Sequence, residues 1–295
     1  MILTYKYKLY KTKRLKKIDE VINIAGIIYN HCIALHKRYY KLYGKYLNKY
    51  QLQKHLTKLK KLPKYQYYKK VPSQAIQDII DRIDKAFKLF FRNKKKKIKS
   101  SPPSFKKVSK YKSYTFKQAG YKIENNIIWL NGYKFKFWLS RPIDGKIKTI
   151  TIKRDNVGDY VILVAIEKEY QKINASSGKI VGIDFGLKTF LTLSDKTQIQ
   201  APRHYLKYLN NLKQLQKKLS KKIKNSNNYK LAKKQLARLY QKVVNSRGDF
   251  FHKLANELAK KYHDRENASI NICRVGVSTF GWEGVRVAIC QQPSF

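Results

Sequence analysis

Residues 179–186 read Lys-Ile-Val-Gly-Ile-Asp-Phe-Gly, a largely apolar run that ends in a carboxylate, Asp184, and a glycine two residues later. Short apolar runs bounded by glycine are typical of buried strands. Residues 190–193 (Phe-Leu-Thr-Leu) then form the second arm of a hairpin, and leucines recur at helical spacing over 206–223 and 231–243. A further helix is expected over 249–261. Residues 171–295 are therefore predicted to form a small sheet with a helical hairpin over 203–245.

The N-terminal half reads differently. Residues 2–10 alternate apolar and polar side chains, as a strand does, and residues 111–170 contain four more short strands separated by turn residues. Between them lie two helical patterns, one over 15–49 and one that begins after Pro72. We expect an α+β fold: a β-barrel of residues 1–12 and 101–170, with a helical block of residues 13–100 inserted into it.

The net charge of the chain indicates which class of partner the protein binds. Lys and Arg number 66 against 18 Asp and Glu, which gives a formal net charge of +48. A polyanion neutralises such a surface and releases its counterions on binding, which favours a nucleic-acid ligand over a merely basic surface. Hydrophobic residues make up 43% and aromatic residues 13%, enough for a folded core rather than a disordered basic tail. No membrane span or secretory signal is expected, and we predict a cytoplasmic protein.

Cysteine and histidine spacing argues against a zinc site. Cys32, Cys273 and Cys290 lie far apart, and no C-x-x-C pair occurs. A zinc ribbon built from two such pairs is therefore excluded. The six histidines are also scattered. We expect no zinc and no other cofactor.

Gly-Ile-Asp-x-Gly at the end of a strand, followed by an apolar hairpin arm, opens the RNase H-like fold, in which the aspartate holds a divalent metal. The pattern alone also fits actin-like ATPases and plain turns. Other stretches are more specific, and they occur in the order of one family: 71–77, 84–91, 104–106, 113–116, 141–146, 181–188 and 249–253. On these stretches, which reach to about residue 262, the chain resembles the TnpB family. These are RNA-guided nucleases of bacterial insertion sequences, ancestral to type V CRISPR effectors.

The resemblance implies a WED-like barrel, a REC-like helical recognition block and a RuvC domain, which is RNase H-like. The chain departs from the family after Lys261. There the family continues into a strand that ends in glutamate, then a zinc ribbon, then the motif D-R-D-x-N-A. Here Tyr262 runs directly into His-Asp-Arg-Glu-Asn (263–267), and Arg265 stands where the family places a metal-binding aspartate.

These departures predict a truncated, degenerate RuvC domain. Two-metal cleavage needs several converging carboxylates, and Mg²⁺ requires oxygen ligands in near-octahedral geometry. Asp184, Asp264 and Glu266 are the remnants of such a site. We therefore expect no intact catalytic site and no metal, with Mg²⁺ only if a residual site survives.

The resemblance also places DNA and RNA contacts. It implies that the DNA motif flanking the target is contacted by Ser73, Gln74, Gln77, Ser113 and Thr115. Gln can read adenine, although Gln74 and Gln77 could equally be solvated helix residues. Nucleic-acid backbone contacts are expected from Lys94, Lys95, Lys96, Lys97, Lys106 and Lys107. Tyr65, Tyr67 and Tyr68 could stack on unpaired bases, or could simply pack in the core.

The sequence thus predicts a nuclease-dead TnpB-like repressor. Such a protein binds a guide RNA, occupies a matching double-stranded DNA site and blocks transcription, as a monomeric ribonucleoprotein at the bacterial nucleoid. One alternative is a residual Mg²⁺-dependent RNA-guided endonuclease. The other is a decayed transposon fragment that binds RNA unspecifically.

Overall fold

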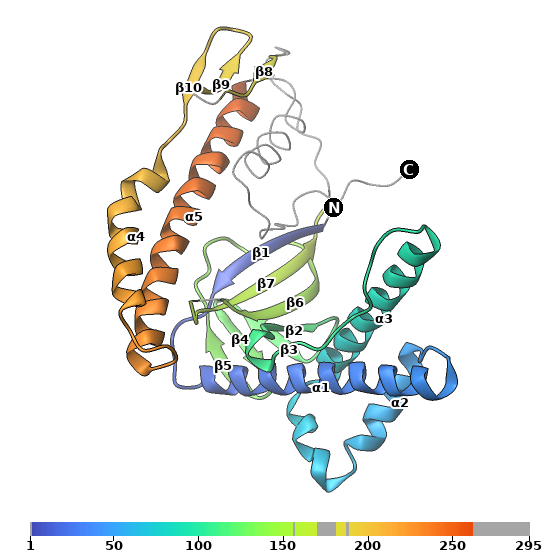
Figure 1. Cartoon of the computed structure of the whole chain (residues 1–295). Helices are drawn as coiled ribbons and strands as arrows, with labels where there is room; N and C mark the ends of the chain where they lie inside the picture. Colours follow the sequence, from blue (N-terminus) through green and yellow to red (C-terminus); the bar gives the residue numbers. More distant parts are fainter. Residues whose placement is uncertain (1, 156, 170–180, 187–188, 262–295) are drawn as a thin grey trace. The chain divides into compact units, whose positions relative to one another are not determined.

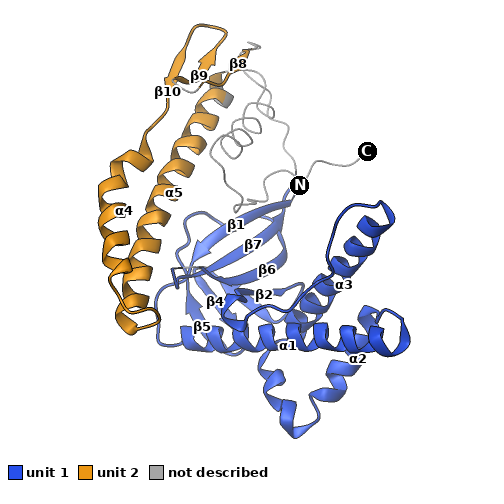
Figure 2. Cartoon of the chain, in the orientation of Figure 1, with its two compact units in different colours: residues 1–170 blue, residues 171–295 orange. Residues whose placement is uncertain are grey.

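A computed structural model describes residues 2–155, 157–169, 181–186 and 189–261. They belong to two compact units, residues 1–170 and 171–295 (Figure 2). Unit 1 contains β1 (Ile2–Lys8), α1 (Leu15–Tyr43), α2 (Lys49–Leu59), the 3-10 helix η1 (Pro63–Lys70), α3 (Ser73–Lys95), the 3-10 helix η2 (Val108–Lys110), β2 (Ser113–Phe116), β3 (Tyr121–Glu124), β4 (Ile127–Leu130), β5 (Tyr133–Lys136), β6 (Lys146–Arg154) and β7 (Tyr160–Glu167) (Figure 1).

The strands of unit 1 form two antiparallel sheets, one in the order β1-β7-β6-β2 and one in the order β3-β4-β5. The sheets join where Leu9 pairs with Phe137 and the Trp138 amide donates to the Lys8 carbonyl at 2.8 Å. The barrel expected from the sequence does not close in the described residues. The chain turns after Phe116, with Gly120 at a φ of +95°, and β3 pairs with β4 instead of extending the β2 edge.

Helices lie between β1 and β2 in the chain, as the sequence predicts. The buried face of α1 includes Ile22, Ala25 and Ile28, and α1 packs against α3, which in turn contacts β2. The expected helix over 15–49 is interrupted. Gly44, at a φ of +63°, caps α1, and its amide donates to the Tyr40 carbonyl. The helix α2, which the sequence reading missed, then begins with a reciprocal cap between Asn48 and Gln51.

By length and composition α1 could cross a membrane, but more than half of its apolar window is buried inside unit 1. A core helix of a folded unit is buried in this way and passes the same test of length and composition.

One arginine ties the larger sheet to the helices. Arg154, at the end of β6, donates through Nη1 to Asp19 Oδ1 on α1 at 2.6 Å, and through Nη2 to the Tyr111 carbonyl at 3.0 Å. Only 19% of its side chain is exposed. Arg154 therefore fixes the start of α1 and the segment before β2 to the same sheet.

Unit 2 contains β8 (Ile183–Asp184), β9 (Thr189–Leu193), β10 (Gln198–Gln200), α4 (His204–Ser220) and α5 (Asn227–Lys261). The strands pair in the order β10-β9-β8, and α4 packs along α5 (Figure 1). Leu191, Leu193, Leu254 and Leu258 contribute to the core between this sheet and α5. The hairpin predicted from β8 and β9 and the α4–α5 helical pair are both present.

Two expectations for unit 2 are corrected. The buried strand predicted from residue 179 consists of only two residues in the described part of the chain, and Asp184 is exposed. The break expected before Asp249 is absent, because α5 runs continuously through Gly248. Gly186 follows Asp184, and an added Cβ at this position would lie 2.6 Å from the Thr189 carbonyl oxygen.

Candidate nucleic-acid interface

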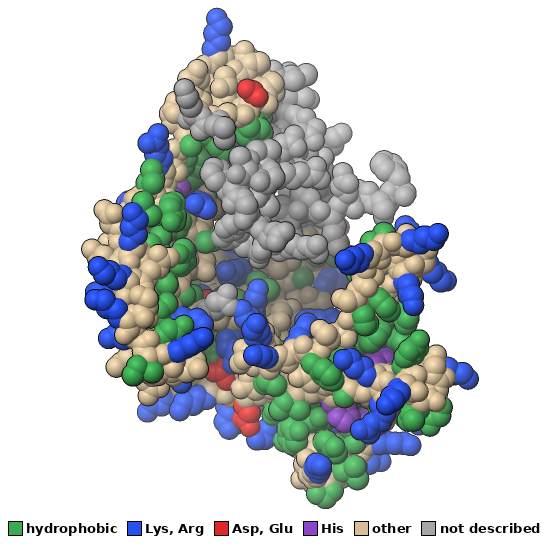
Figure 3. Space-filling view, in the orientation of Figure 1, with side chains coloured by type: hydrophobic (Ala, Val, Ile, Leu, Met, Phe, Trp, Pro, Cys, Tyr) green, Lys and Arg blue, Asp and Glu red, His purple; other side chains and the backbone are tan. Residues whose placement is uncertain are grey.

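Lysine and arginine dominate the charged surface. Their side chains lie over much of the face shown in Figure 3, on the helices of both units, and acidic side chains are few there. Within unit 1 most acidic groups are ion-paired, as in the Lys8–Asp159 and Lys88–Asp84 contacts. The remaining positive charge is available to phosphate groups.

The flanking-motif residues lie on α3 and β2, two elements that contact each other. Ser73 and Gln77 are exposed on the first turns of α3, Gln74 is half-buried, and Ser113 lies at the start of β2. All five predicted residues therefore lie on two neighbouring elements, and Ser73 and Gln77 are exposed on α3.

Thr115 does not fit the expected DNA contact. Its side chain is 5% exposed, and its Oγ1 lies 2.5 Å from Arg82 Nη2 and 2.8 Å from Thr151 Oγ1. The hydroxyl is therefore used inside the protein, where it accepts a hydrogen bond from Arg82. Thr115 positions the guanidinium and does not itself face solvent.

Arg82 and Lys117 are the cations of this face that the sequence reading missed. Arg82 Nη2 lies 2.6 Å from Asp78 Oδ2, and 45% of the Arg82 side chain is exposed. Lys117 pairs with Asp81. Burial raises the pKa of Asp78, against the opposing effect of Arg82 and Lys117. In the sequence, Asp78 and Arg82 look like an ordinary i,i+4 helix pair, so nothing marked the arginine as a surface group beside β2.

The predicted backbone contacts divide into two groups. Lys94, Lys95, Lys96 and Lys97 are exposed at and beyond the end of α3, as phosphate contacts require. Lys106 belongs to a segment held on α1. Its backbone exchanges two hydrogen bonds with the Asn30 side chain, at 2.8 and 2.9 Å, and its Nζ lies 4.7 Å from the centre of the Tyr29 ring. Lys107, the next residue, is exposed.

The tyrosines of η1 face the protein more than the solvent. Tyr68 is 1% exposed, Tyr65 is half-buried, and both rings contact His31 edge-on. Tyr67 is 37% exposed. Core packing, the alternative considered from the sequence, is correct for Tyr68.

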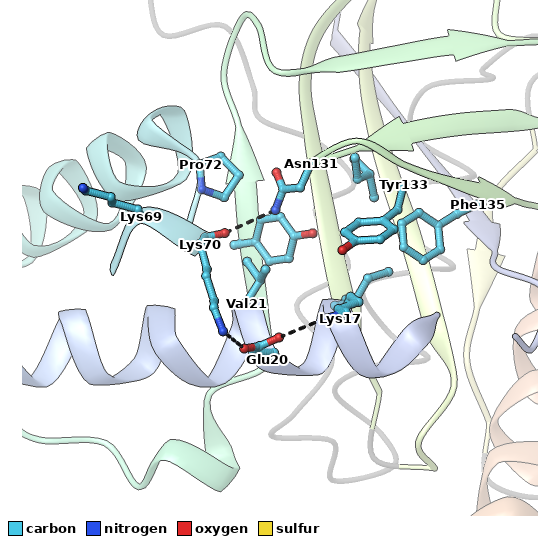
Figure 4. Close-up of a pocket in the computed structure, with 12 residues that line it drawn as sticks. Lys17, Glu20, Val21, Lys69, Lys70, Pro72, Asn131, Tyr133 and Phe135 are labelled. Atoms are coloured by element: carbon cyan, nitrogen blue, oxygen red, sulfur yellow. Dashed lines mark hydrogen bonds and ion pairs between the residues drawn. The ribbon is translucent and has the colours of Figure 1, made fainter. Parts of the chain in front are cut away.

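A pocket of about 430 Å³ lies between α1, η1 and the β4–β5 hairpin. Figure 4 shows Glu20 between Lys17 and Lys70, with Tyr133 and Phe135 on the opposite side. Glu20 Oε1 lies 2.5 Å from Lys70 Nζ, and Oε2 lies 4.0 Å from Lys17 Nζ. The other lining residues are Ile18, Val21, Lys69, Pro72, Tyr114, Leu130 and Asn131. No motif in the sequence marked this pocket, because its walls come from four separate segments.

The acidic groups of unit 2 do not converge in the described part of the chain. Asp184 is exposed on β8, Asp195 lies 3.4 Å from Lys261, and Asp249 pairs with Lys253 at 2.8 Å within α5. Among the described residues no three His, Cys, Asp or Glu side chains form a group that could hold a metal ion. Asp264 and Glu266 lie outside the described residues. The described side chains alone therefore do not fit a two-metal site.

Comparisons with known proteins relate the chain to insertion-sequence proteins. Residues 162–273 match the family model OrfB_IS605, described as "Probable transposase". An Escherichia coli K12 protein named "Putative RNA-guided DNA endonuclease InsQ" is 28% identical over 249 residues, which cover 82% of this chain and 60% of that protein. A Streptomyces pristinaespiralis protein named "Putative RNA-guided DNA endonuclease" is 26% identical over 282 residues, 91% of this chain and 65% of that protein. The chain thus spans less than two thirds of the length of either relative.

The fold resembles that of a Cas12f protein. The solved structure is described as "Cryo-EM structure of the Cas12f1-sgRNA-target DNA complex". It matches with a TM-score of 0.50 and 13% identity over 85% of this chain and 64% of that chain. The α+β class and the resemblance to TnpB-type proteins are confirmed at this level. The RNase H-like placement of unit 2 stays a prediction, as does the loss of nuclease activity.

Proposed function

We propose that the chain is an RNA-guided DNA-binding protein, which holds a guide RNA and occupies a DNA site that matches it. The observation that carries this proposal is the α3–β2 face. Exposed Ser73 and Gln77 lie on the first turns of α3, and the same helix carries Arg82, whose guanidinium is held by Thr115 and Asp78. Amide side chains can read base edges, and a fixed arginine can contact phosphate or guanine.

The charge and the comparisons support the same function. A net charge of +48 suits a protein that covers both a guide RNA and a duplex, since such proteins hold nucleic acid mainly through its backbone. The two relatives are named as RNA-guided DNA endonucleases. The Cas12f complex to which the fold is similar contains an sgRNA and target DNA.

Cleavage is the second candidate, and the names of the relatives favour it over the nuclease-dead repressor expected from the sequence. The finer proposal of a repressor rests on Arg265, which stands in place of an expected ligand, and on the missing strand after Lys261. A metal site would have to join Asp184 to Asp264 and Glu266. Because the described residues contribute only Asp184, we derive no cleavage step.

Guide dependence is tested by sequencing the RNA that co-purifies with the full chain, followed by binding to DNA that matches the RNA end. We expect one RNA species and tight binding only to matched DNA. Gln77→Ala should weaken that binding, while Gln118→Ala, an exposed glutamine beyond β2, should not. A random RNA pool with no preference for matched DNA would refute guided binding and would favour the decayed fragment.

Cleavage is tested with the same matched DNA in Mg²⁺. Cutting that Asp184→Ala abolishes would establish the endonuclease. Binding without cutting, by protein in its natural complex with RNA, would establish the nuclease-dead form. Repression of a reporter promoter that carries the matched site would then follow from occupancy alone.

A further inference from the structure

The pocket between α1, η1 and the β4–β5 hairpin has the composition of a nucleotide site. Its volume of about 430 Å³ lies within the range of roughly 300–1,000 Å³ common for ligand pockets. We propose that it receives one unpaired nucleotide, whose base stacks on Tyr133 and whose phosphate is held by Lys17.

One side of the pocket suits the flat face of a base. Tyr133 is 39% exposed at the start of β5, beside buried Leu130 and Phe135. Stacking on an aromatic ring is how proteins hold unpaired bases without regard to their pairing edge. Lys17 Nζ lies 6.0 Å from the centre of the Tyr133 ring, at the outer limit of a cation–π contact, and can move to a phosphate.

Glu20 on α1 and Asn131 in the β4–β5 turn offer hydrogen-bond acceptors. Glu20 Oε1 is engaged by Lys70, but the 4.0 Å between Oε2 and Lys17 is longer than a hydrogen bond, so Oε2 can accept from a base N–H group. The hydrogen bond from Lys70 lowers the pKa of Glu20, which keeps the group an acceptor. Asn131 Nδ2 donates to the Lys70 carbonyl at 3.4 Å, which leaves Oδ1 as a second acceptor. These acceptors favour a base with an exocyclic amino group over uracil or thymine.

The position of the pocket deepens the proposed function and rests on it. Pro72 lines the pocket, and the next residue, Ser73, begins the helix expected to contact flanking DNA. A nucleotide that is unpaired next to the flanking DNA would therefore lie close enough to enter the pocket. Strand-separated DNA and the guide RNA can both supply it.

The test uses the full chain and nine-nucleotide oligothymidine or oligouridine strands with one central 2-aminopurine. We expect the fluorescence of this base to be quenched on binding, and affinity to fall about tenfold in Tyr133→Ala, the order reported for loss of one stacked base. Tyr133→Phe should bind as the wild type does. Tyr40→Ala is the matched control, because Tyr40 is exposed near the other end of α1. The strand with the larger Tyr133 effect, DNA or RNA, identifies the source.

Equal affinity for Tyr133→Ala and Tyr40→Ala would overturn the proposal. Glu20→Gln should reduce the preference for the 2-aminopurine strand over the unmodified strand, and an unchanged preference would remove the assigned role of Glu20. If Tyr133→Ala fails to fold, Lys17→Ala with exposed Lys61→Ala as its control gives the same comparison. If binding depends on Tyr133 but the co-purified RNA is a random pool, guided targeting is rejected and the proposal of a nucleotide site in the pocket stands. If guided targeting is present and Tyr133→Ala does not affect it, only the proposal of a nucleotide site in the pocket is rejected.

Discussion

Replacing Arg154 by methionine should destabilise unit 1 by about 2–3 kcal/mol. The change removes a charge-assisted hydrogen bond to Asp19 and a second bond to the Tyr111 carbonyl, while keeping most of the side-chain volume. Hydrogen bonds to charged groups contribute roughly 1.5–3 kcal/mol and neutral ones about 1 kcal/mol. Asp19 is 37% exposed, so solvent screens part of its interaction and the sum belongs at the lower end.

Urea unfolding followed by tryptophan fluorescence measures this loss, because Trp129 and Trp138 both belong to unit 1. The midpoint should fall with an unchanged m-value, and the melting temperature should drop by roughly 5–10 °C for a unit of this size. Arg14→Met, an exposed arginine at the start of α1, should leave both unchanged. Equal effects of the two substitutions would refute the role assigned to Arg154. A double-mutant cycle with Asp19→Asn should show coupling, since both changes remove the same contact.

Three further outcomes are expected. Gly186→Ala should lower the melting temperature of unit 2, because its Cβ would meet the Thr189 carbonyl oxygen at 2.6 Å, whereas Gly248→Ala should not, since nothing lies within 4 Å there; equal effects in circular dichroism melts would contradict this close approach. His36 is 4% exposed and burial lowers its pKa to about 4, so the unfolded chain takes up a proton near pH 6.5 that the folded chain does not. Stability should therefore fall by about 3 kcal/mol between pH 6.5 and 4, and His36→Leu should flatten that part of the urea-midpoint profile; an identical profile would show that another group titrates. Alanine at all four positions Lys94–Lys97 should reduce the slope of log affinity against log salt for duplex DNA by up to about 3.6, and an unchanged slope would remove these lysines from the phosphate contacts.

The periodic elements could be predicted because burial imposed their pattern. The α1 stripe reads at helical spacing since one face is covered, and turns at Asn125 and Asn131 read correctly because both adopt positive φ. The same reasoning failed for α5, where it predicted a break that the helix does not have. Asn245, Ser246, Gly248 and Asp249 look like a break, but Val243, Leu254 and Leu258 are buried on either side of it. Such packing exceeds the roughly 1 kcal/mol that an interior glycine costs.

The binding residues were harder to predict because they depend on contacts between distant segments. Three consecutive residues of β2, Tyr114 to Phe116, are buried, so the usual alternation gave no sign that Thr115 faces inward. His31 and His55 lie 24 positions apart, yet their Nε2 atoms are 3.1 Å apart across α1 and α2. The separation of two histidines along the sequence does not predict whether they are in contact in the fold.

The pairing of β1 with β7 has a consequence for synthesis. Ile2 pairs with Glu167, so β1 leaves the ribosome more than 150 residues ahead of the strand with which it pairs. At roughly 5–20 residues per second, that delay is on the order of 10–30 s. The basic helices α1 to α3 emerge from the ribosome during this delay and can contact RNA before β1 pairs with β7. Protease digestion of ribosome-stalled chains cut short before and after residue 167 would reveal that order.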